Sequence, residues 1–79
     1  MSLIVYFRTY RGFLIDIHKE GLFYGFVVTE EGVAVSTSGV SFTNAAYVDR
    51  MAQEMIDAIL TSREIERRFW LDALESMPL

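Results

Sequence analysis

Three short polar connections, ending at Gly12, Gly21 and Gly32, divide the first half of the chain into segments rich in apolar residues. In the first two segments apolar side chains recur at every second position, a period typical of strands with one buried face. Glycine tolerates the positive φ that tight hairpin turns need. The pattern therefore predicts an antiparallel β-meander of three to four strands over about residues 3–37. Because Gly12 also suits a bulge, the first eighteen residues form either one bent strand or two.

The second half of the chain changes to a helical period. Its apolar stripe predicts an amphipathic helix over about residues 44–61, with Thr43 or Ser41 as the N-cap. The stripe comprises Ala45, Val48, Met51, Ala52, Met55, Ile56, Ile59 and Leu60, and the opposite side carries Arg50, Gln53, Glu54 and Asp57. We expect the stripe to be buried against the sheet.

A second helix is predicted over about residues 62–76, because Thr61-Ser62 interrupts the stripe and Thr61 with Glu64 matches a capping box. The expected fold is therefore a single α+β domain over residues 1–79. It consists of the meander followed by two C-terminal α-helices packed on one sheet face.

The length of 79 residues limits the chain to one small core, which by itself supplies only about 3–5 kcal/mol. No cysteine is present, so a disulfide or a thiolate metal site cannot reinforce it. The apolar fraction is 52%, somewhat above the ~45–50% typical of globular domains. A small core cannot house this surplus, which favours burial in a homo-oligomer or against a protein partner.

The net charge of −4 is spread unevenly: residues 1–28 carry +1 and the remainder −5. An acidic helical half argues against nucleic acid as a partner, because non-specific affinity for phosphates needs a positive field. The weakly basic sheet half leaves nucleic-acid binding as an alternative. The apolar runs are too short to cross a bilayer, so we expect no membrane association and a cytoplasmic location.

Two polar groups in the predicted sheet are candidate sites. Tyr6, Arg8 and Tyr10 share one face of the first strand, beside Asp16 and His18 if the second strand pairs with it. Aromatic residues interleaved with arginine can anchor a protein partner or stack on bases, and they also occur on ordinary solvated faces. A binding surface and an ordinary solvated face stay equally open. If the surface binds a partner, a protein is favoured over a nucleic acid.

Asp16 and His18 could act together in general-base catalysis, with the carboxylate orienting the imidazole. No nucleophile motif accompanies them, and as metal ligands they would need a further donor. The sequence therefore predicts no enzyme activity, no catalytic residue, no metal and no cofactor.

The predicted second helix carries Phe69, Trp70, Leu71 and Leu74 among other apolar residues. These residues are either buried in the core of the same chain or contact another chain at an interface. Their arc covers more than the ~100° that one packed neighbour needs. We expect part of the arc to face another chain, with Trp70 near the centre of that contact, since tryptophan is enriched among interface anchors.

The order of a meander and then a helix, with Thr37-Ser38-Gly39 ahead of Phe42, resembles two families over about residues 10–60. These are the HicB-like antitoxins and the plant ethylene-response-factor DNA-binding domain, and the resemblance implies a sheet followed by a helix. The glycine-rich turn and proline segment of the antitoxins are missing here. The plant domain reads DNA with arginine and tryptophan on a basic sheet, and this sheet has few such residues. No functional residue is carried over from either family.

The functional hypothesis is a non-catalytic protein–protein interaction or regulatory module that self-associates or forms a small subunit of an assembly. One alternative is a nucleic-acid-binding regulator that uses Tyr6, Arg8, Tyr10 and Arg11. A second alternative is an enzyme that uses Asp16 and His18.

Overall fold

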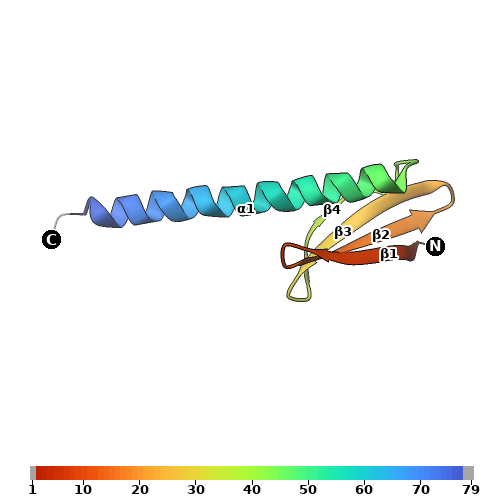
Figure 1. Cartoon of the computed structure of the whole chain (residues 1–79), viewed down its shortest axis with the longest axis horizontal. Helices are drawn as coiled ribbons and strands as arrows, with labels where there is room; N and C mark the ends of the chain where they lie inside the picture. The colour runs from red at the N-terminus through yellow and green to blue at the C-terminus, as the bar shows by residue number, and fades with distance from the viewer. Residues whose placement is uncertain (1, 78–79) are drawn as a thin grey trace.

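The computed structural model describes residues 2–77, which form one sheet and one helix (Figure 1). Four strands pair antiparallel in chain order. The elements are β1 (Leu3–Tyr10), β2 (Phe13–Glu20), β3 (Phe23–Glu30), β4 (Val33–Thr37) and α1 (Ala45–Glu75). The predicted meander and the α+β class are confirmed, and β1 and β2 are separate strands rather than one bent strand.

Tight turns fix the register of the sheet. Arg11 and Gly12 have φ values of 51° and 86° between β1 and β2, and Glu31 and Gly32 have 49° and 82° between β3 and β4. Two consecutive positive φ values are the mark of a type I′ turn, whose twist matches that of the strands it joins. Because these turns allow little slippage, they also fix which side chains face the helix.

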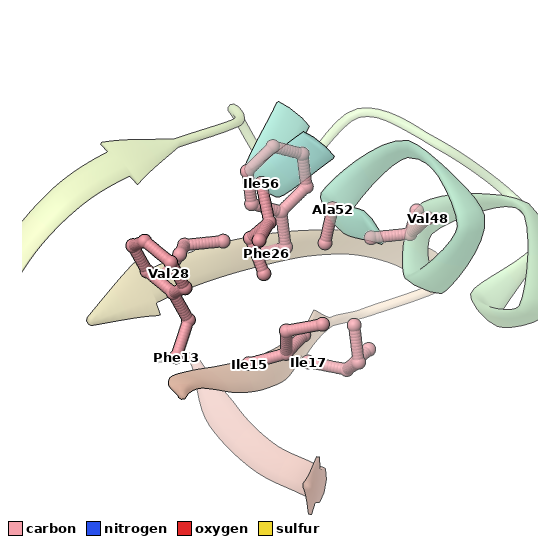
Figure 2. Close-up of a cluster of buried hydrophobic side chains, with 8 residues drawn as sticks. All are labelled: Phe13, Ile15, Ile17, Phe26, Val28, Val48, Ala52 and Ile56. Atoms are coloured by element: carbon pink, nitrogen blue, oxygen red, sulfur yellow. The ribbon is translucent and has the colours of Figure 1, made fainter. Parts of the chain in front are cut away.

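The core lies between the first half of α1 and the central strands β2 and β3 (Figure 2). Its eight buried residues are Phe13, Ile15, Ile17, Phe26, Val28, Val48, Ala52 and Ile56. The buried alternation of the second strand is thus confirmed. A helix is about 10–12 Å wide and strands are about 4.8 Å apart, so one helix covers roughly two strands. The edge strands β1 and β4 therefore lie outside the main contact.

The prediction of two helices is wrong, because α1 is a single helix of 31 residues. Thr61 and Ser62 lie within it, and their side chains are exposed. A helical threonine or serine costs only about 0.5–0.7 kcal/mol relative to alanine, whereas a break leaves several backbone groups without partners. The N-cap is Asn44 rather than Thr43 or Ser41, and its side chain accepts a hydrogen bond of 3.0 Å from the backbone N–H of Tyr47.

The helix continues well beyond the sheet (Figure 1). Residues 61–77, called the tail here, are all exposed except the partly buried Ala73. The expectation that a second helix packs on the sheet is therefore also wrong. The radius of gyration is 16.6 Å, compared with about 12 Å for a compact domain of this length. The molecule is a small globular head with a helical extension.

Gly25 allows the linker before α1 to cross β3 closely. A Cβ atom at this position would lie 2.7 Å from the carbonyl oxygen of Gly39. On either side of this approach, Tyr24 and Phe42 exchange backbone hydrogen bonds, and the backbone N–H of Ser38 donates to the carbonyl of Phe26. The close approach positions the start of α1 over the sheet.

Ile56 and Met55 belong to the same predicted stripe, but Ile56 is fully buried and Met55 is 41% exposed. We expect Ile56→Ala to lower the free energy of unfolding by about 2–5 kcal/mol, because it leaves a cavity in the core. Met55→Ala is the matched control and should cost about 1 kcal/mol or less. Urea denaturation of the two variants at equal concentration tests this, and equal losses would contradict the assignment of the buried face.

Candidate interaction surface

The face of β1 that carries Tyr6, Arg8 and Tyr10 is on the same side of the sheet as α1, and of these three Tyr6 is still 50% exposed. Antiparallel partners share a face, and the register places Tyr6, Arg8 and Tyr10 opposite Ile17, Ile15 and Phe13. The expectation that they lie beside Asp16 and His18 is therefore wrong, because those two residues point to the opposite face of the sheet. This opposite face, away from α1, is called the open face here.

Arg8 binds the helix through a bidentate ion pair with Asp49. Its Nε and Nη2 atoms donate to the two carboxylate oxygens at 3.1 and 2.9 Å. The Gln53 side-chain amide donates to the same carboxylate at 2.8 Å. The hydrogen bonds from Arg8 are the main cause that lowers the pKa of Asp49. Arg8 therefore helps to hold β1 to α1.

A second attachment joins the end of β1 to Asp57. The Arg11 Nη1 atom and the Tyr10 hydroxyl donate to this carboxylate at 2.7 and 3.0 Å. The hydrogen bond from Arg11 is the main cause that lowers the pKa of Asp57, and the hydrogen bond from Tyr10 adds to it. The same bond to Asp57 raises the pKa of Tyr10. Asp57 was expected on the polar side of the helix, away from the sheet, but it lies at the flank that meets β1.

The helix leaves the sheet beside a third ion pair. The Arg63 guanidinium donates to both carboxylate oxygens of Glu30 at 2.7 and 2.8 Å, which lowers the pKa of Glu30. Sequence reasoning missed all three ion pairs, since their partners lie far apart in the chain. The only available signal was the spacing of Asp49, Gln53 and Asp57, which places a row of polar side chains along one helix flank.

The tail continues the stripe that α1 buries over the sheet. Eighteen residues make five full helical turns, so Trp70 and Leu74 lie in line with the buried Ala52 and Ile56. Trp70 is 58% exposed, and its ring meets that of Phe69 edge-on at 5.6 Å between centroids. The term tail stripe is used here for the exposed apolar residues Phe69, Trp70, Leu71, Leu74 and Met77. Four of them were predicted as protein-binding residues. Trp70 and Leu74 share one helix face, and Phe69 and Leu71 lie about 100° to either side of Trp70.

A second apolar surface lies at the free edge of β1. The register shifts between Ile4 and Tyr6, which makes Val5 a bulge. Next to it is a groove of about 560 Å³, called the β1 groove. Ile4, Val5, Tyr6, Phe7 and Asp16 line it. Of the predicted sheet site, Tyr6 lies here, whereas Arg8 and Tyr10 do not. Sequence reasoning missed this groove, because no residue type marks the bulge.

The remaining candidates do not form a recognisable chemical centre. The Nδ1 atom of His18 is 3.1 Å from the Ser2 hydroxyl, and Asp16 lines the β1 groove. Among residues 2–77, no cluster of three His, Cys, Asp or Glu side chains could hold a metal ion. No helix in this part of the chain is long and apolar enough to cross a membrane. Comparison of the chain with protein-family models, curated proteins and solved structures found no match.

The three ion pairs predict how stability depends on pH. Folding lowers the pKa values of Glu30, Asp49 and Asp57, so their stabilising effect is complete above the ordinary carboxyl values near 4. It is lost as the pH falls through the lowered values. Urea denaturation between pH 6 and pH 2 should therefore show a progressive decrease in the free energy of unfolding.

The double variant Asp49→Asn, Asp57→Asn provides the control for this pH dependence. It should be less stable than the original chain at pH 6 and should lose less stability on acidification, because two of the three titrating carboxylates are gone. Parallel pH profiles for the two proteins would show that these contacts do not stabilise the fold.

Proposed function

We propose that this chain is a non-catalytic protein–protein interaction module that binds through the tail stripe. The observation that carries the proposal is the continuity of the stripe. The same helix face that is buried over the sheet continues for several turns beyond it, and its large apolar side chains are exposed there. Exposed clusters of this kind mark interaction sites in soluble proteins.

The physical properties of the tail support this proposal. Most helical stability in proteins comes from tertiary packing, and isolated helices shorter than about 12–15 residues are marginal in water. The helical part of the tail, residues 61–75, is at this limit and receives almost no packing from the head of the same molecule. A partner that covers the tail stripe would stabilise the helix and bury Trp70. Tryptophan is one of the residue types enriched at interface hot spots.

The two alternative functions have less support. In the nucleic-acid hypothesis the cations are Arg8 and Arg11, and both are paired with helix carboxylates. Phosphate binding would have to compete with those ion pairs. Catalysis by Asp16 and His18 stays a hypothesis without a supporting contact between them.

Site-specific photocrosslinking in cells tests the proposed function. Benzoylphenylalanine at position 74 lies on the tail stripe, whereas the same group at position 72 lies nearly opposite Trp70 on the helix. We expect a discrete protein adduct from position 74 and little from position 72. No adduct at position 74, or equal adducts from both positions, would refute binding through the tail stripe.

A further inference from the structure

We propose that the tail stripe binds the β1 groove of a second copy of this chain, and that the contact is made twice in a two-fold dimer. This inference rests on the proposed function and specifies its partner. Trp70 of each copy enters the groove of the other, between Ile4 and Phe7. Its indole N–H donates a hydrogen bond to Asp16.

The positions of the two surfaces favour a second copy. Residues 4–7, in the first half of β1, line the β1 groove. The N-terminal end of β1 lies at the end of the sheet where α1 begins, and the tail projects from the opposite end (Figure 1). The molecule is 61 Å long. A copy that runs antiparallel presents its groove to one tail and its tail to the other groove. One closed symmetric interface thereby covers both apolar surfaces.

The chemistry of the groove matches that of a tryptophan side chain. The lining is apolar or aromatic apart from the carboxylate of Asp16. An indole ring is a large apolar body with a single N–H donor, which needs an acceptor when it is buried. Asp16 takes part in none of the four ion pairs formed among residues 2–77. Its carboxylate can therefore accept this hydrogen bond without the loss of an ion pair.

The exposed area agrees with an interface of ordinary size. The chain exposes 5884 Å², whereas a compact monomer of 9.1 kDa exposes about 4,900 Å². The excess of about 1,000 Å² is close to the ~800 Å² that each partner buries in a standard protein–protein interface. The extra surface that each elongated molecule exposes is therefore about the area that it would bury in one dimer interface.

The single tryptophan of the chain allows a direct measurement on the full-length protein. We expect sedimentation equilibrium to show a dimer at micromolar concentration. The tryptophan emission should shift to shorter wavelength over the same concentration range, because Trp70 leaves water on dimerisation. A protein that stays monomeric at millimolar concentration would overturn the proposal.

Two variants locate the contact. Phe7→Ala in the groove should weaken dimerisation about tenfold or more and abolish the concentration-dependent emission shift. Val33→Ala removes a similarly exposed side chain at the other edge of the sheet and should change neither. If Phe7→Ala reduces the circular dichroism of the fold, Ile4→Ala replaces it, with the same expected results.

Mixing variants tests whether tail and groove meet each other. Trp70→Ala and Phe7→Ala should each dimerise poorly alone. Their mixture should form a heterodimer about tenfold tighter than either homodimer, because one of its two contacts is intact. A dimer sensitive to Trp70→Ala but not to Phe7→Ala or Ile4→Ala would indicate pairing between two tails. That result would overturn the groove contact and leave the proposed function intact, whereas failure of crosslinking at position 74 would remove both.

Discussion

The packing of Val48, Ala52 and Ile56 against the central strands determines the rest of this structure. These three helix residues, with five from β2 and β3, form the entire set of buried apolar residues in the described chain. One helix has only enough width to cover two strands. The contact therefore leaves the edge strands and the distal half of α1 outside the core, and these regions contain the two candidate interaction surfaces.

Ion pairs along the β1 flank of α1 and at the point where it leaves the sheet help to fix its rotation. Asp49 and Asp57 are held from β1, and Arg63 is held from the end of β3. Partly exposed pairs of this kind each contribute little to stability. Their combined effect is orientational, because a helix attached at three positions along its length resists rolling about its axis. The direction in which the tail presents Trp70 is thus set by contacts made several turns earlier.

Local patterns predicted the meander and the buried face of β2, since an alternation of period two and turns that contain glycine act over a few residues. The single helix was not predictable in this way. Thr61-Ser62 carries the chemistry of a cap, but a polar pair on an exposed face leaves a helix intact. The alternation of β1 also indicated a buried face, yet residues 3–7 are exposed because no second layer covers that edge. The ion pairs and the groove depend on register and on a bulge, which local sequence does not encode. The tail residues predicted to bind protein are all exposed, and their binding role stays a prediction.

The Arg63–Glu30 pair lies where α1 leaves the sheet. The tail beyond this pair is unsupported, so a tilt of the helix at this point moves the whole tail. The helix continues for twelve residues after Arg63, to Glu75, which corresponds to roughly 18 Å of helix. A tilt of about 10° at this point would move the far end by roughly 3 Å, more than half of one strand spacing. A small change in the tilt of α1 beside Glu30 therefore becomes a displacement of several ångströms at the end of the tail.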